Sequence, residues 1–103
     1  MLLVNIEYIP GKEIEALGMV KGTVVQSKNF GKDFMAGMKT LVGGEITGYT
    51  EMLNEARQIA TKRMADAAEA LGADAVVNVR YASSSVMQGA AEVVAYGTAV
   101  KFK

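Results

Sequence analysis

The chain has 103 residues, with eleven basic and eleven acidic side chains and neither cysteine nor histidine. These counts exclude disulfides, thiol chemistry and every role that needs an imidazole, the commonest general base and metal ligand. The balanced charge argues against binding to nucleic acids or membrane surfaces, which needs a sustained basic surface. The length suits a single domain over residues 1–103.

Hydrophobic residues make up 50% of the chain, and eleven glycines add to the apolar share. Even without the four tyrosines, the total exceeds the roughly 45–50% of an ordinary soluble domain. A small domain has little interior, so part of this excess is expected on the surface, where it favours self-association. The first ten residues show neither a signal peptide nor a membrane span. We therefore expect a cytoplasmic homo-oligomer.

The first quarter of the chain predicts two strands. Residues 2–6 form a short apolar run that ends at the turn-forming pair Pro10-Gly11. Residues 13–27 then alternate as an extended segment. Gly18 and Gly22 inside that segment predict a bulge, a bend or the close approach of another backbone.

The middle of the chain predicts one short and one long helix. Asn29 suits the N-cap of a short helix over residues 30–42. The long helix is predicted over residues 49–71, with Gly72 where a left-handed C-cap belongs. Its expected apolar stripe is rich in alanine and contains Leu53, Ala56, Ala60, Met64, Ala67 and Leu71. Such a helix can lie close to the surface that it covers.

The C-terminal part predicts two more strands, over residues 75–82 and 92–102, joined by a polar loop over residues 83–90. One face of the last strand is mostly small, and consists of Val93, Ala95, Gly97, Ala99 and Lys101. A face of small residues suits close packing against the alanine-rich helix. The predicted fold is therefore α+β, with a largely antiparallel sheet packed against one long and one short helix.

Several short motifs recur along the chain in a specific order. They are Gly22 with Asn29 and Asp33, the Gly43-Gly44 pair, Tyr49 with Leu53 and Ala56-Arg57, the run from Leu71 to Val77, and the run from Tyr96 to Val100. In this order and spacing the sequence resembles the YbjQ-like family, small bacterial and archaeal proteins for which heavy-metal binding has been suggested. The resemblance implies a small α+β fold that assembles into ring-shaped homo-oligomers, pentamers by expectation. It implies no settled activity.

Metal binding meets a chemical obstacle in this chain. Soft heavy metals prefer thiolate or imidazole ligands, and the sequence has neither. Met35 and Met38 on the predicted short helix are the candidate thioether ligands, although a pair at this spacing more often serves packing or an interface. Hard ions could use Asp33, Glu45 or Asp74, but no calcium-loop pattern accompanies them. No cofactor is predicted.

Arg57 falls inside the predicted apolar stripe of the long helix. A guanidinium in such a place needs an acid, an aromatic ring or a subunit boundary. It could form a structural salt bridge to Asp33 or Asp74, or bind an anion in a cleft between subunits. The candidate ligand or interface residues are Arg57, Asp33, Asp74, Asn29 and Tyr49.

These observations favour a non-enzymatic, ring-forming homo-oligomer that serves as a binding or structural module. Its predicted partner is itself, with a small ligand possible and no catalytic residue assigned. Two alternatives stay open. One is a metal-binding protein with methionine or carboxylate ligands, and the other is a carboxylate-dependent enzyme that uses Asp33.

Overall fold

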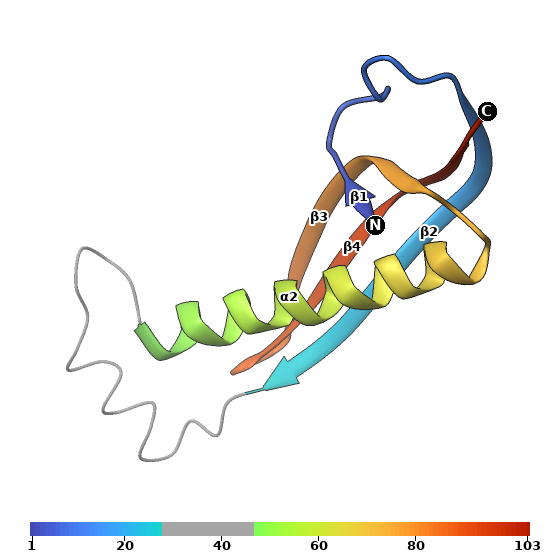
Figure 1. Ribbon diagram of the computed structural model, residues 1–103. Coiled ribbons are helices and arrows are strands. Elements are labelled where there is room, and N and C mark those ends of the chain that lie inside the picture. The colour runs from blue at the N-terminus through green and yellow to red at the C-terminus, as the bar shows by residue number, and fades with distance from the viewer. Residues whose placement is uncertain (28–46) are drawn as a thin grey trace.

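The computed structural model describes residues 1–27 and 47–103, in which one helix crosses one face of a four-stranded sheet (Figure 1). The helix is α2 (Thr47–Ala70), and the strands are β1 (Leu2–Leu3), β2 (Ile14–Ser27), β3 (Ala75–Met87) and β4 (Ala90–Phe102). Their order in the sheet is β1-β3-β4-β2, with β1 parallel to β3 and the other pairs antiparallel. The α+β prediction is confirmed for the long helix and the sheet. The predicted short helix over residues 30–42 lies outside the described residues.

The hairpin of β3 and β4 is longer than the sequence predicts. The loop expected over residues 83–90 is wrong, because β3 continues to Met87 and pairs with β4 through Ser83↔Val93 and Ser85↔Ala91. Pairing with β4 satisfies the backbone N–H and C=O groups of this segment, so its polar serine side chains do not prevent it from forming a strand. Only a tight turn remains, in which Gly89 has a positive φ of 81°.

The N-terminal segment folds back onto the start of the sheet. β1 ends at Leu3, earlier than predicted, and the chain continues through single hydrogen bonds such as Val4 N to Val76 O at 3.0 Å. Farther along, Ile9 packs into a small second core on the sheet face opposite α2. The other buried members of that core are Ala75, Val77 and Val100. The N-terminal segment therefore covers one end of this sheet face.

The buried row of α2 differs slightly from the predicted stripe. It consists of Met52, Ala56, Ala60, Met64 and Ala68, spaced four residues apart. Ala56, Ala60 and Met64 are correctly predicted, whereas Leu71 is exposed beyond the end of the helix. Gly72, at φ 78°, is the left-handed C-cap that the sequence predicts, and its N–H donates to Glu69 O at 2.9 Å.

Close packing between α2 and β2 depends on Gly22. A Cβ atom at Gly22 would overlap the carbonyl oxygen of Ala60 and the amide nitrogen of Met64. The sequence-based expectation of a close backbone approach is therefore confirmed here. Gly18 marks a bulge in the pairing of β2 with β4, where its φ is 135°.

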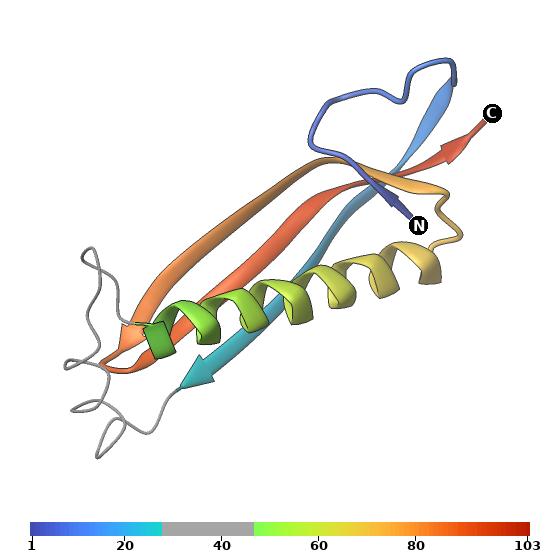
Figure 2. The ribbon, with the colours of Figure 1, turned by 60° about the vertical axis from the view of Figure 1, so that its left-hand side comes forward.

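The rest of the sheet face opposite α2 has no cover among the described residues (Figure 2). We call it the open sheet face. It carries Met19, Lys21, Thr23 and Val25 of β2, Glu92, Val94, Tyr96 and Thr98 of β4, and Arg80, Ala82 and Ser84 of β3. Met19 is 82% exposed and Val25 is 58% exposed. Large apolar side chains are therefore exposed to solvent in the isolated protomer.

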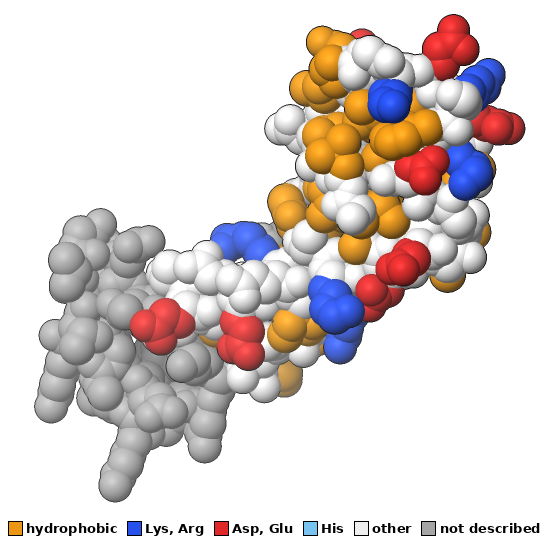
Figure 3. All heavy atoms as spheres, in the orientation of Figure 1, with side chains coloured by type: hydrophobic (Ala, Val, Ile, Leu, Met, Phe, Trp, Pro, Cys, Tyr) orange, Lys and Arg blue, Asp and Glu red, His pale blue; other side chains and the backbone are white. Residues whose placement is uncertain are grey.

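The helix side of the molecule differs from the open sheet face. Acidic and basic side chains lie along α2, and hydrophobic side chains gather near the N-terminal segment (Figure 3). Exposed apolar residues of that segment include Met1, Leu2, Ile6 and Tyr8. The outer surface of α2 is thus a charged, solvated surface.

Candidate functional site

A β-bulge in β3 organises the most irregular part of the sheet. Asn78 has a φ of 56°, a left-handed conformation that asparagine tolerates better than most residues. The register of β3 against β4 shifts between Val77 and Arg80. Because of the bulge, two successive amides donate to the N-terminal segment, Asn78 N to Ile6 O at 2.9 Å and Val79 N to Val4 O at 3.0 Å. The bulge therefore fixes both the N-terminal segment and the direction of Arg80.

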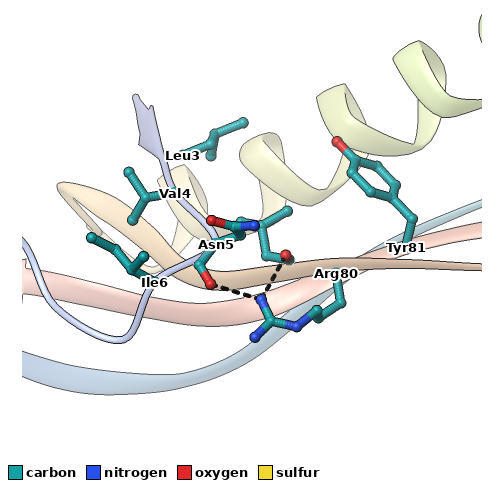
Figure 4. A pocket seen from close by; sticks show the side chains of 7 residues that line it. Leu3, Val4, Asn5, Ile6, Arg80 and Tyr81 are labelled. Carbon is teal, nitrogen blue, oxygen red and sulfur yellow. Dashed lines mark hydrogen bonds between the residues drawn. The ribbon is translucent and has the colours of Figure 1, made fainter.

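The guanidinium of Arg80 is only partly used within the protomer. Its Nη1 donates to the carbonyl oxygens of Asn5 at 2.8 Å and Val79 at 3.1 Å (Figure 4). In the described part of the chain, Nη2 and Nε have no hydrogen-bond partner, and Arg80 forms no salt bridge. A groove of about 770 Å³ runs past it, lined by Leu3, Val4, Asn5, Ile6, Val79, Arg80 and Tyr81. Arg80 thus presents, at an accessible surface, donors that no described protein group uses.

A second groove lies on the α2 side of β3. Tyr81 projects toward α2, away from Arg80 (Figure 4), and its hydroxyl lies 2.8 Å from Thr61 Oγ1. When Thr61 Oγ1 donates to the carbonyl oxygen of Arg57 at 2.6 Å, the Tyr81 hydroxyl donates to Thr61 Oγ1. This groove, of about 530 Å³, is lined by Leu3, Arg57, Gln58, Thr61, Lys62, Ala65 and Tyr81. Since Leu3 and Tyr81 line both grooves, the two hollows adjoin along β3.

Arg57 itself is not inside the apolar stripe, so that part of the prediction is wrong. It is exposed, and its Nη1 donates to Asn54 Oδ1 at 2.7 Å. The suggested salt bridge to Asp74 does not form, because Asp74 lies beyond the far end of α2. Thirteen helical residues after Arg57 span about 20 Å. Arg57 does line a groove, as the anion-binding hypothesis requires.

The other predicted site residues are scattered or undescribed. Tyr49 is half-buried in the first turn of α2. Asn29, Asp33, Met35 and Met38 lie outside the described residues. The structure therefore does not bring the predicted set together into one site.

Asp74 has a structural position at the start of β3. Its Oδ2 accepts a hydrogen bond from Phe102 N at 2.8 Å, and its own N–H donates to Val100 O at 2.8 Å. Asp74→Ala should lower the free energy of unfolding by about 1–2 kcal/mol, since it leaves the Phe102 amide without its partner. The control Asp66→Ala, which removes an exposed surface ion pair with Lys62, should cost less than about 0.5 kcal/mol. Urea denaturation measures both, and equal losses would contradict a specific role for Asp74.

Sequence reasoning missed Asn78 and Arg80. The available signal was an asparagine inside a β-branched run, Val76-Val77-Asn78-Val79, because asparagine is depleted in strands and tolerates left-handed backbone. Simple alternation predicts a regular strand over residues 75–82. It therefore misses the bulge at Asn78 that sets the direction of Arg80.

Fold and grooves define a small α+β protein with two arginine-bearing grooves along one sheet edge. The family model for YbjQ, described as "Putative heavy-metal-binding", matches residues 1–103, so the chain belongs to this family. It is 65% identical to a UPF0145 protein of Clostridium novyi over 98% of each chain. It is 63% identical to a UPF0145 protein of Alkaliphilus metalliredigens over 99% of each chain. A crystal structure of a DUF74-family protein of unknown function from Pediococcus pentosaceus has the same fold, with a TM-score of 0.65 at 15% identity. That match covers 100% of this chain and 98% of the other.

The donor atoms of the described residues do not fit the heavy-metal description. The sequence contains no cysteine or histidine, and no cluster of three acidic side chains suited to a metal occurs within residues 1–27 and 47–103. Of the described methionines, Met52 and Met64 are buried in the core, while Met1, Met19 and Met87 are exposed. Soft metals would therefore lack their preferred ligands in the described structure. Among the described helical residues, none form a helix long and apolar enough to cross a membrane.

Proposed function

We propose that this protein is a non-enzymatic, ring-forming homo-oligomer that serves as a binding or structural module. The observation that carries the proposal is the open sheet face, where apolar side chains such as Met19, Val25 and Tyr96 are exposed in the protomer. Exposed apolar side chains on an uncovered sheet face favour an interface, even though polar side chains lie between them. The zero net charge offers no long-range repulsion between copies.

The edges of the sheet suggest how copies could join. β2 forms one edge, and β3 beyond its short pairing with β1 forms the other, without a further strand among the described residues. β2 and β3 run parallel to each other, because both are antiparallel to β4. The β3 edge of one copy can therefore meet the β2 edge of the next in a parallel, head-to-tail contact. Contacts of this kind close into rings when the rotation between copies allows it. When the joined sheet curves with its open face inward, the exposed apolar side chains of that face are enclosed by the ring.

The elongated shape of the protomer supports the same proposal. Its radius of gyration is 16.9 Å, with extents of 54 × 25 × 17 Å. A compact domain of about 100 residues has a radius of gyration of about 13 Å. In a ring, the groove at Arg57 would lie next to the β3 edge and so close to a neighbouring copy. We propose that a small anionic ligand is held there.

The proposal of a non-enzymatic role rests on the side chains available. Without histidine or cysteine, the chain lacks the commonest general base and the strongest neutral-pH nucleophile. Turnover of any substrate that is lost in Asp33→Asn would contradict this part of the proposal and favour a carboxylate-dependent enzyme.

Sedimentation velocity at micromolar concentration tests the assembly. We expect one species whose mass is an integral multiple of 10.9 kDa, five copies by the family resemblance. A compact species at the monomer mass would overturn the proposal.

A further inference from the structure

A third hollow opens on the open sheet face beside the bulge of β3. Its volume is about 270 Å³, and it is lined by Met19, Asn78, Arg80, Tyr96, Gly97 and Thr98. The polar groups among them are a guanidinium, an amide and two hydroxyls, all of which can donate hydrogen bonds. No carboxylate of the described residues lines this hollow. We call it the bulge hollow.

Positive charge lies on both sides of the hollow's tyrosine. Lys21 on β2 and Arg80 on β3 are both directly opposite Tyr96 on β4, so the three form one cross-strand row. Glu7 lines an adjoining hollow together with Arg80 but forms no salt bridge with it. Glu92 lies four residues along β4 from Tyr96, about 13 Å away at strand spacing. The local charge of the hollow is therefore positive although the whole chain is neutral.

Arg80 lines the bulge hollow with a guanidinium that is only partly used by protein groups. Nη1 is held by the two backbone carbonyls of Asn5 and Val79, which fixes the guanidinium and leaves Nη2 and Nε for a ligand. A fixed guanidinium fork is the preferred protein group for phosphate and other oxyanions. Left-handed, bulged backbone such as that at Asn78 recurs at binding sites, where it aims side chains.

We propose that the bulge hollow binds a phosphate group, either as inorganic phosphate or as part of a small phosphorylated molecule. Arg80 supplies the charged donors, Asn78, Tyr96 and Thr98 supply neutral donors, and Lys21 adds charge at the rim. All five residues come from one copy of the chain. The site is separate from the groove at Arg57 and does not require the proposed ring, in which it would open toward the central channel.

Isothermal titration calorimetry with inorganic phosphate at low ionic strength tests the proposal, with methyl phosphate and acetate as parallel ligands. We expect saturable phosphate binding at one site per copy, weakened at least about tenfold by Arg80→Gln, because a hydrogen bond to a charged group contributes about 1.5–3 kcal/mol. If methyl phosphate binds as tightly as inorganic phosphate, the source of the group is a phosphorylated molecule. Acetate binding as tightly as phosphate would overturn the assignment to phosphate.

Arg63→Gln is the matched control, because it removes the same charge from an exposed arginine on α2 whose Nη1 donates to Thr23 O at 2.7 Å. It should leave phosphate affinity unchanged, and equal weakening by both variants would contradict the site. If Arg80→Gln does not fold, the double variant Tyr96→Phe and Thr98→Val removes only two hydroxyls and should still weaken binding several-fold. Sedimentation of the same samples separates the two proposals, since phosphate binding by a monomer would overturn only the ring.

Discussion

Replacing Gly22 by alanine should lower the free energy of unfolding by about 3 kcal/mol or more. The added Cβ would overlap backbone atoms of Ala60 and Met64, and its nearest side-chain atom, Arg63 Cβ, would lie 2.8 Å away. Backbone atoms of a packed helix cannot rotate out of the way, so α2 would have to move off β2. Ala60 and Met64 are fully buried, so that movement would disturb the centre of the core. Urea denaturation followed by circular dichroism measures the loss.

Lys21→Ala is the control for this prediction. Lys21 precedes Gly22 on the same strand but lies on the open sheet face, where its side chain is exposed. The control should change the free energy of unfolding by less than about 0.5 kcal/mol. A Gly22→Ala protein as stable as the Lys21→Ala protein would contradict the close contact between α2 and β2.

Placing two lysines on the open sheet face, by the double variant Met19→Lys and Val25→Lys, should dissociate the assembly at micromolar concentration. Both side chains are mostly exposed in the protomer and would be buried between copies. Burial of one such side chain contributes about 1.5–3 kcal/mol, so losing two should weaken association at least about a hundredfold. Burying the two ammonium groups instead would add a further penalty. Light scattering coupled to size-exclusion chromatography measures the mass, and circular dichroism confirms folding.

The double variant Glu55→Gln and Glu69→Gln is the matched control, because it changes the net charge by the same amount on the exposed surface of α2. This control should assemble like the unaltered protein. Dissociation of both variants would show that net charge alone, rather than the open sheet face, controls assembly.

Local pattern predicted the long helix and the C-terminal strands because their periodicities are strong. Alanines spaced four residues apart predicted a closely packed helix, and the small face of β4 predicted its partner. Gly22 and Gly72 were assigned correctly because a close contact and a left-handed cap each require glycine. At such positions the residue type alone indicates the local backbone geometry.

The sequence could not predict features that depend on tertiary pairing. The serines of β3 resemble a loop, but pairing with β4 holds them in a strand. A predicted stripe that includes Leu53 also includes Arg57. The buried row instead runs through Met52 and Ala56 on the adjacent side of the helix. Arg80 became visible as a site residue only through the bulge at Asn78 and the return of the N-terminal segment.

Native mass spectrometry of the untreated protein, with metal analysis of the same sample, tests the central claim most directly. We predict a single oligomer that is a multiple of the 10.9 kDa chain and carries no stoichiometric metal. A monomer would contradict the proposed assembly. A stoichiometric heavy metal on the oligomer would contradict the conclusion that its donor atoms do not suit one.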